Sequence, residues 1–276
     1  GESGCGKTTC GRTVVGLYQR DGGMVRYNGQ DVHAMRGARR AAFCREVQTI
    51  FQDPYSSLDS KNNVADLIAE GIDINGLARS RAERLDRVKQ LMEQVGLNLS
   101  GLYRYPHEFS GGMRQRIGIA RALAVEPKFI LCDEPISALD VSIQAQIINL
   151  LLDLREERGL TYLMISHDLS MVRHVSDRIL VMYLGKVVET CPAAELYAHP
   201  AHPYTRALIS AIPIADPRVE RKRQRIILTG QVPSPSQALS GCPFAGRCPY
   251  AAERCRREAP CLREVASGHY AACHTV

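Results

Sequence analysis

The sequence has no apolar run that approaches the roughly 18 residues needed for a transmembrane helix. It also has no basic, apolar and small-residue leader ahead of its first motif, although a start upstream of Gly1 could hold one. Of its 276 residues, 45% are hydrophobic, which is enough to build a core. The sequence therefore predicts a soluble globular chain of one large domain or two modest ones.

The main part of the chain lacks an excess of positive charge. The net charge is +6, and residues 212–276 carry ten Lys and Arg against five Asp and Glu, so most of the excess lies in the tail. A surface that binds nucleic acid usually has a basic stripe, and we therefore expect no nucleic-acid interface on the main domain. Residues 218–225, RVERKRQR, are predicted to form a solvated linker, with contact to anionic lipid as the alternative.

The first eight residues, Gly1–Thr8, match the phosphate-binding pattern G-x-x-x-x-G-K-[ST]. Glycines in this pattern let backbone N–H groups surround phosphates, Lys7 adds a positive charge, and the Thr8 hydroxyl can hold Mg²⁺. The predicted ligand is therefore a nucleoside triphosphate. A helix is predicted from near Lys7, and we expect the strand that normally comes before such a loop to lie upstream of Gly1.

The pattern of apolar residues predicts alternating strands and helices. Short apolar runs predict strands, and apolar residues three and four apart predict helices. The predicted strands cover residues 24–27, 46–51, 129–132, 161–165, 178–183 and 186–189. The predicted helices cover residues 63–71, 80–95, 111–124 and 142–157, with another from Asp168, and the first three form a helical insert. Strands that alternate with helices predict a mostly parallel sheet.

An acidic pair, Asp133 and Glu134, follows the predicted strand at residues 129–132. Ligands collect at the carboxyl edge of open α/β sheets, so we expect this pair to face the same crevice as the phosphate loop. Asp133 can hold Mg²⁺, directly or through water. Glu134 would then lie within reach of the terminal phosphate, and we predict that it is the general base for an attacking water.

Four further segments suit a phosphate site. They are Gln52 after a strand, Ser110-Gly111-Gly112 at a helix start, the run Ser137–Asp140, and His167 after a strand. Each is weak alone, because such residues are common in loops and at helix caps. The Ser-Gly-Gly helix start offers N–H groups to a phosphate, although the chain already has one such site. A second phosphate site predicts a composite pocket between two subunits.

In this order, the motifs resemble those of the ATPase subunit of an ABC transporter, and the resemblance covers nearly the whole chain. It implies an α/β P-loop NTPase fold of ABC type, with a mostly parallel sheet, a helical insert and a small Cys-rich C-terminal extension. The catalytic residues that it implies are Glu134, His167 and Gln52, and the implied Mg²⁺ ligands are Thr8, Gln52 and Asp133. The nucleotide-binding residues that it implies are Gly1, Ser3, Gly4, Cys5, Gly6, Lys7, Thr8, Thr9, the signature Ser110, Gly111 and Gly112, and Asp140 of the D-loop.

The resemblance also implies partners. Members of this family form a head-to-tail dimer in which the phosphate loop of one subunit and the signature of the other clamp each ATP. The implied partners are therefore a second ATPase subunit, identical or different, and two membrane permease subunits, with an extracytoplasmic solute-binding protein acting indirectly. The chain would lie peripherally at the cytoplasmic face of the membrane. Met113 replaces the glutamine common at the end of the signature, which leaves the phosphate contacts of Ser110 and Gly112 intact.

The C-terminal part of the sequence resembles the oligopeptide and dipeptide importer branch of this family. The resemblance rests on residues 200–208, 230–235 and 241–250, which read PAHPYTRAL, GQVPSP and GCPFAGRCPY. It implies an ATPase domain at 1–211, with a helical subdomain at about 60–125, and an extension at 212–276. The implied function is ATP-driven import of peptides or of a related solute such as nickel. The competing hypothesis is a soluble ABC-type ATPase that acts on nucleic acid or ribosomes.

The ten cysteines fall into two groups. Five are scattered, as expected of small residues in a reducing compartment, and five crowd into the last 35 residues, where a core is hard to build. In the importer branch such a tail can carry a [4Fe-4S] cluster, and the matching positions are Cys242, Cys248, Cys255 and Cys273, with Cys261 as an extra.

Other interpretations of the tail stay open. Four thiolates also suit zinc, although the close C-x-x-C pairs that zinc prefers are absent. The cysteines could also stay reduced and unligated, or form a redox sensor that gates the motor. His269 and His274 are alternative ligands, and a structural role is the stronger prediction for both.

Overall fold

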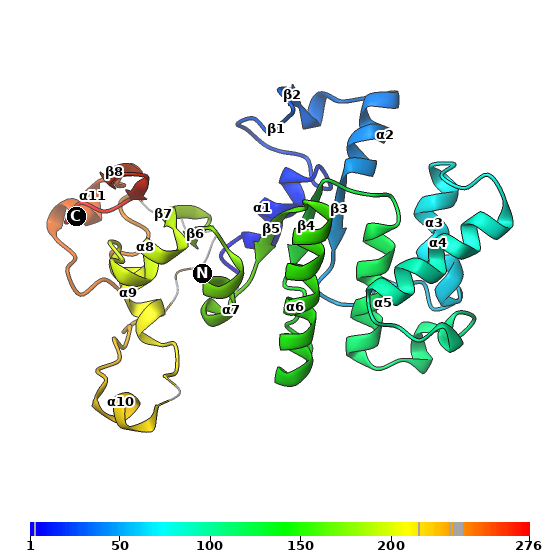
Figure 1. The fold of residues 1–276 in the computed structure, drawn as a ribbon. Helices are drawn as coiled ribbons and strands as arrows, with labels where there is room; N and C mark the ends of the chain where they lie inside the picture. Colours follow the sequence, from blue (N-terminus) through cyan, green and yellow to red (C-terminus); the bar gives the residue numbers. More distant parts are fainter. Residues whose placement is uncertain (3, 215, 232, 234–239) are drawn as a thin grey trace. The chain divides into compact units, whose positions relative to one another are not determined.

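The computed structural model describes residues 1–2, 4–214, 216–231, 233 and 240–276 (Figure 1). These residues divide into two compact units. We call Thr8–Ile165 the core unit, and Gly1–Lys7 together with Ser166–Val276 the tail unit. The start of the phosphate loop thus belongs to the same unit as the C-terminal part of the chain.

The core unit contains three parallel strands, a short hairpin and the longest helices. Its strands are β1 (Arg26–Tyr27), β2 (Gln30–Asp31), β3 (Val47–Ile50), β4 (Phe129–Asp133) and β5 (Thr161–Ile165). Its α-helices are α1 (Lys7–Val14, which begins at the last residue of the tail unit), α2 (Gly37–Glu46), α3 (Val64–Ile74), α4 (Arg81–Gln94), α5 (Gly111–Leu123) and α6 (Val141–Arg158). Short 3₁₀ turns cover Val32–Ala34, Leu99–Gly101 and Pro106–Glu108.

The main sheet of the core unit has the order β3-β4-β5, and both pairings are parallel. β4 is central, and three of its residues, Ile130, Leu131 and Cys132, are fully buried. Helix α1 packs closely on this sheet at Gly11, where a Cβ atom would lie 2.6 Å from Ile165 Cδ1. A larger residue there would force the side chains of Ile165 and Leu131 to move, so the glycine permits close packing of the phosphate-binding helix on the sheet.

The helical insert is present as predicted, and its helices begin at side-chain caps. Asn63 accepts a hydrogen bond from the backbone N–H of Asp66 at the start of α3, and Ser80 accepts one from Glu83 at the start of α4. The three helices pack against one another through buried apolar residues, including Ile68 of α3, Met92 of α4 and Ile119 of α5 (Figure 1).

The tail unit contains a four-stranded antiparallel sheet in the order β6-β7-β9-β8. Its strands are β6 (Arg178–Tyr183), β7 (Lys186–Pro192), β8 (Arg263–Ala266) and β9 (His269–Ala271). Its helices are short: α7 (Leu169–Val175), α8 (Ala193–Ala198), α9 (Pro203–Ser210), α10 (Pro217–Lys222) and α11 (Glu253–Arg257).

The prediction of a parallel sheet holds for β3, β4 and β5 and fails for the strands at 178–183 and 186–189. β6 and β7 pair antiparallel, because only Leu184 and Gly185 join them. Both linking residues have positive φ, 44° and 74°, as in the two-residue hairpin turns that match strand twist. Asn28 and Gly29 make a similar turn between β1 and β2, with φ of 49° and 77°.

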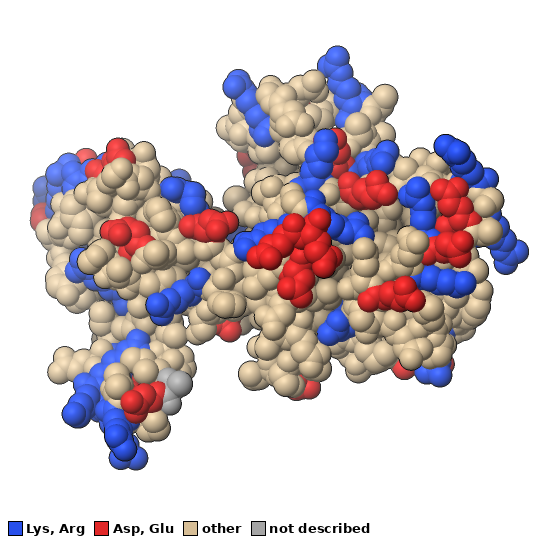
Figure 2. Space-filling view, in the orientation of Figure 1, with Lys and Arg blue, Asp and Glu red and all other residues tan. Residues whose placement is uncertain are grey.

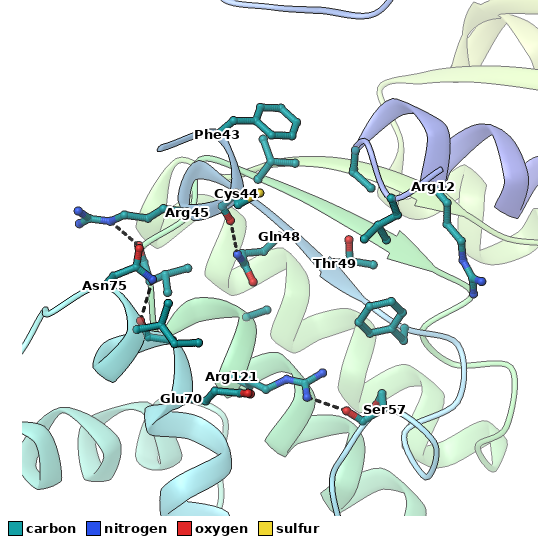
Figure 3. Close-up of a pocket in the computed structure, with 18 of the residues that line it drawn as sticks. Arg12, Phe43, Cys44, Arg45, Gln48, Thr49, Ser57, Glu70, Asn75 and Arg121 are labelled. Carbon is teal, nitrogen blue, oxygen red and sulfur yellow. Dashed lines mark hydrogen bonds between the residues drawn. The ribbon is translucent and has the colours of Figure 1, made fainter. Parts of the chain in front are cut away.

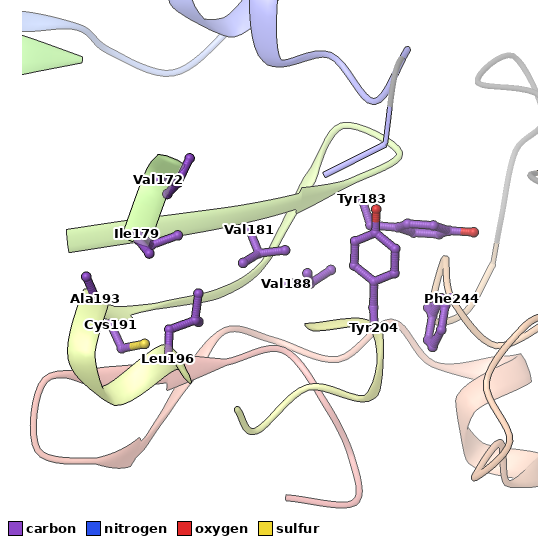
Figure 4. Packing of buried hydrophobic residues seen from close by; sticks show 10 residues of the cluster. All are labelled: Val172, Ile179, Val181, Tyr183, Val188, Cys191, Ala193, Leu196, Tyr204 and Phe244. Atoms are coloured by element: carbon purple, nitrogen blue, oxygen red, sulfur yellow. The ribbon is translucent and has the colours of Figure 1, made fainter. Parts of the chain in front are cut away.

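The core of the tail unit joins the β6-β7 hairpin to the C-terminal segment (Figure 4). Ile179, Val181 and Val188 of the hairpin share one buried cluster with Tyr204 of α9 and with Phe244, which lies far along the chain. Residues near 244 are therefore fixed by packing on β6 and β7.

A buried carboxylate also holds the tail unit together. Glu189 on β7 accepts hydrogen bonds from the backbone N–H groups of Ala201 and His202, at 2.7 and 3.0 Å. Its Oε1 also lies 2.7 Å from Nε2 of His269 on β9. His269 thus has the structural contact expected of it, which ties the last strand to the loop before α9.

Charge is distributed as the sequence indicates. Over the core unit, the face seen in Figure 2 mixes acidic and basic side chains, whereas the segment around α10 displays mostly basic ones. Helix α10 covers part of the predicted linker at residues 218–225, and none of its residues is buried. Within the described residues, no helix combines the length and the apolar character needed to cross a bilayer.

Candidate functional site

The phosphate loop lies in the tail unit, and its backbone has the conformation that glycine permits. Gly4 and Gly6 have φ of 78° and 93°, in the region that other residues avoid. The ammonium of Lys7 donates hydrogen bonds to the carbonyl oxygens of Gly1 and Glu2, both at 2.9 Å. The loop therefore curls around the lysine side chain.

The loop is also anchored to the β6-β7 hairpin. Cys5 is buried, and its carbonyl oxygen accepts a hydrogen bond from the N–H of Gly185 at 3.0 Å. Gly1 packs so closely on the hairpin that a Cβ atom there would lie 2.1 Å from the carbonyl oxygen of Met182. Ser3, a predicted nucleotide-binding residue, lies outside the described residues.

Thr8 and Asp133 meet in the core unit, as the predicted Mg²⁺ site requires. Thr8 Oγ1 donates a hydrogen bond to Asp133 Oδ1 at 2.8 Å, and Asp133 is fully buried at the end of β4. Asp133 Oδ2 has no hydrogen-bond partner among the described residues, and the guanidinium of Arg12 lies 3.4 Å from it. Hydroxyl and carboxylate oxygens are donors that suit a hard cation, so these residues fit Mg²⁺. Thr9, the next predicted residue, is exposed on α1.

Glu134 and Gln52 form a second contact beside the first. Gln52, in the loop after β3, donates a hydrogen bond from Nε2 to Glu134 Oε2 at 3.0 Å. Glu134 has φ of 48°, a conformation that a non-glycine residue adopts at some cost. Its N–H donates to the carbonyl oxygen of Ile165, and its carbonyl oxygen accepts from the Ser137 hydroxyl, which together hold this turn.

The Ser-Gly-Gly segment begins α5, as predicted. Ser110 is the N-cap and accepts a hydrogen bond from Met113 N–H at 3.4 Å. A Cβ atom at Gly112 would lie 2.5 Å from Cγ2 of Ile143 on α6, so a larger residue there would force Ile143 to move. Asp140, the N-cap of α6, makes no side-chain capping bond and is exposed.

His167 lies in the tail unit, in the turn between β5 and α7, and is exposed. The turn is ordered by its neighbours: Asp168 N–H donates to Ser166 Oγ, and Asp168 caps α7. The structure thus brings Thr8, Asp133, Gln52 and Glu134 together in the core unit, whereas Gly1–Lys7 and His167 belong to the other unit. Arg12 was missed in the sequence, although it lies four residues after Thr8 and so on the same face of α1.

A cavity of about 790 Å³ opens in the core unit beside the Gln52 loop (Figure 3). Residues of α2, β3 and the following loop line one side, and residues of α3 and the end of α5 line the other. Arg121 of α5 reaches across and donates a hydrogen bond to the carbonyl oxygen of Ser57 at 2.6 Å. The loop that carries Gln52 is therefore joined to the helical insert at this cavity.

Four cysteines of the tail line one small pocket: Cys242, Cys248, Cys255 and Cys273. Phe244, Tyr250 and His274 also line it, and burial raises the pKa of the Cys242 and Cys248 thiols. Cys261 is exposed and is not among the residues that line this pocket.

Comparison with known families identifies the chain. Residues 1–137 match the family model described as ABC transporter, and residues 188–255 match the oligopeptide/dipeptide transporter C-terminal region. The oligopeptide transport ATP-binding protein AppF of Bacillus subtilis is 50% identical over 99% of this chain and 83% of its own length. The chain belongs to the ATP-binding subunits of ABC transporters.

Another relative and a solved structure agree with this assignment. The oligopeptide transport ATP-binding protein OppF of Bacillus subtilis is 60% identical over 82% of this chain and 74% of its own length. A dimeric ATP-binding cassette in a post-hydrolysis state, bound to ADP and Pi, superposes with a TM-score of 0.63 at 28% identity, covering 70% of this chain and 82% of that one. The predicted fold class is thereby confirmed, and the chain is an ATPase subunit of an ABC transporter.

Proposed function

We propose that this ABC ATPase powers the import of oligopeptides or dipeptides across the cytoplasmic membrane. The observation that carries the proposal is the match of residues 188–255 to the oligopeptide/dipeptide transporter region, on the same chain as the ABC transporter match. Two relatives, OppF and AppF, are named for oligopeptide transport. The C-terminal match favours import over an ATPase that acts on nucleic acid or ribosomes. A related solute such as nickel would use the same motor, because other chains would select the cargo.

Different residues of the chain would bind the phosphates of ATP and the Mg²⁺ ion. N–H groups of the loop from Gly1 to Thr9 would surround the phosphates, and Lys7 would exchange its present carbonyl partners for phosphate oxygens. Thr8 and Asp133, with Gln52, would hold Mg²⁺. Bound there, Mg²⁺ would neutralise charge that develops on the phosphates.

Glu134 would take the proton from the attacking water. The left-handed backbone of Glu134 and its hydrogen bonds to Ile165 and Ser137 fix the position of this residue directly after β4. Gln52 positions this carboxylate by donating a hydrogen bond to its Oε2, and a carboxylate positioned beside the attacking water can accept its proton. His167, placed after β5, would add a polar contact to the terminal phosphate.

A second copy or a related ATPase subunit would complete the site. Ser110, Gly111 and Gly112 begin a 13-residue helix whose first N–H groups can bind phosphate, and Asp140 begins the next one. A clamp of this kind needs two subunits arranged head to tail, and the related cassette bound to ADP and Pi is dimeric. The ATPase domain would span residues 1–211, and the extension 212–276.

The cavity of the core unit would receive a helix of a permease subunit. It is lined by the exposed Ile74 of α3 and by the loop after β3, at the start of which Gln52 contacts Glu134. Movement of a bound helix would therefore be transmitted to the catalytic carboxylate through one short loop. In this arrangement two permease subunits hold the ATPases at the cytoplasmic face, and an extracytoplasmic solute-binding protein delivers cargo to them.

The four-cysteine pocket would hold a [4Fe-4S] cluster. A single tetrahedral zinc, with Zn–S bonds of about 2.3 Å, would need sulfurs within about 4 Å of one another. Among the described residues, Glu189, Cys191 and His269 have donor atoms that all lie within 4.8 Å of one another. The four tail thiols contain no group of three that is this close. The wider spacing of these thiols around one pocket supports a ligand larger than a single ion. A cluster there would link distant parts of the tail and could exchange one electron.

Glu134→Gln tests the assigned general base. Glutamine keeps the shape and can still accept the hydrogen bond from Gln52, but it cannot take up a proton. Phosphate release should fall about 10²- to 10⁴-fold while ATP binding, measured by equilibrium dialysis, is retained. Glu157→Gln, an exposed position on α6, is the control. Undiminished hydrolysis would remove Glu134 from this role.

Ile74→Asp tests the permease cavity. Ile74 is 78% exposed, so the variant should fold with an unchanged midpoint of thermal unfolding. A charge in an apolar contact should weaken co-purification with the permease about tenfold or more. Ile227→Asp is the matched control, because Ile227 is 83% exposed in the tail unit. Equal loss in both variants, or none in either, would place the permease contact elsewhere.

Cys255→Ser tests the cluster. Chain purified without oxygen should contain about four iron and four sulfide per chain and absorb broadly in the visible range. Replacing Cys255, which is buried, should abolish both signals, whereas Cys261→Ser, at the exposed extra cysteine, should keep them. Stoichiometric zinc without iron would contradict the proposal.

A further inference from the structure

The phosphate loop has a direct contact with the C-terminal extension. Arg247 Nη1 lies 3.1 and 2.9 Å from the two carboxylate oxygens of Glu2, and 3.5 Å from the hydroxyl of Tyr183. The Arg247 side chain is 10% exposed and that of Glu2 31%. Because the pair is partly shielded from solvent, salt screens it less than a fully exposed pair. These bonds raise the pKa of Arg247, so it stays charged.

A second contact binds the backbone of the same residue. The N–H of Glu2 donates a hydrogen bond to the hydroxyl of Tyr204 at 2.8 Å, and Tyr204 is fully buried. Its ring packs against Tyr183 and Phe244, with centroid separations of 4.7 and 5.4 Å (Figure 4). Glu2 is therefore held at its side chain by Arg247 and at its backbone by Tyr204, which belongs to a buried aromatic cluster.

Glu2 in turn holds the rest of the loop. Its carbonyl oxygen accepts hydrogen bonds from Lys7 Nζ at 2.9 Å and from Cys5 N–H at 3.4 Å. A shift of Glu2 would therefore move the lysine and the N–H groups that are to face the phosphates.

The charge of Glu2 creates a requirement. A carboxylate within a loop that binds a triphosphate would repel it, unless a positive group neutralises that carboxylate. Within the described residues, the ion pair recorded for Glu2 is the one with Arg247. Arg247 precedes Cys248 in the chain, and Phe244 follows Cys242 by two residues, so the cysteine pocket and the loop contact share one short segment.

We propose that Arg247 of the C-terminal extension is a positioning residue for ATP binding. It neutralises Glu2 and, together with Tyr204, sets the phosphate loop in the shape that receives the triphosphate. The extension is thus part of the nucleotide site and acts without touching the nucleotide. This inference rests on the proposed function, since it assigns a role within ATP binding.

The test compares ATP kinetics of full-length variants. Arg247→Ala should raise the KM for ATP about tenfold and leave kcat nearly unchanged, because ground-state binding is lost and the chemistry is not. Arg247→Lys should recover much of the loss, since a single nitrogen of Arg247 makes all the contacts. The control is Arg257→Ala, which removes an exposed pair with Glu253 in the same extension.

A double variant separates charge from packing. In the Arg247→Ala background, Glu2→Gln removes the unneutralised carboxylate and should lower the KM for ATP back toward the original value. Effects that add, with the double variant worse than either single one, would overturn the proposal, as would a KM for Arg247→Ala equal to that of the Arg257→Ala control.

Hydrogen exchange of the nucleotide-free chain provides a measurement that needs no turnover. The Glu2 and Cys5 amides should exchange faster in Arg247→Ala and in Tyr204→Phe, which keeps the ring in the core, while the amides of β6 and β7 keep their protection. Unchanged exchange at Glu2 would contradict the inference. Absence of ATP hydrolysis by the unmodified chain would contradict the proposed function alone, and this measurement would still decide the role of Arg247.

Discussion

A fully buried carboxylate, Asp133, is the constraint on which the site depends. A charge without solvent must have partners, and here these are the hydroxyl of Thr8 and the guanidinium of Arg12, both from α1. The contact fixes the phosphate-binding helix at the carboxyl end of β4, and Gly11 permits the close packing that brings the helix there. Glu134 follows in the chain, so the placement of Asp133 also decides where the proposed base can lie.

Hydrogen bonds connect the segment of Asp133 and Glu134 to other parts of the core unit. Gln52 joins Glu134 to the loop after β3, and Arg121 joins the same loop to the helical insert at the large cavity. Within the tail unit, the phosphate loop is held by the β6-β7 hairpin and by the aromatic cluster of Tyr183, Tyr204 and Phe244.

Local patterns in the sequence predicted most of the elements. The apolar run at 129–132 predicted β4, and Asn28-Gly29 predicted the first hairpin. The phosphate pattern and the acidic pair together predicted the meeting of Thr8 with Asp133, because both motifs lie at the same edge of a parallel sheet. The antiparallel pairing of β6 and β7 was missed, since Leu184-Gly185 is a weaker turn signal than Asn-Gly. The Arg247–Glu2 pair spans 245 residues, and no local spacing predicts a contact of that kind.

The most direct test of the account is the dependence of ATP binding on Mg²⁺ in a Thr8→Val variant. Valine preserves the shape of threonine but removes the hydroxyl that contacts Asp133 and would bind the cation. Calorimetric titration of the unmodified chain and of Thr8→Ser should give ATP affinities that rise with Mg²⁺, whereas the affinity of Thr8→Val should be weaker and independent of Mg²⁺. The same Mg²⁺ dependence in all three chains would contradict the assignment of this site.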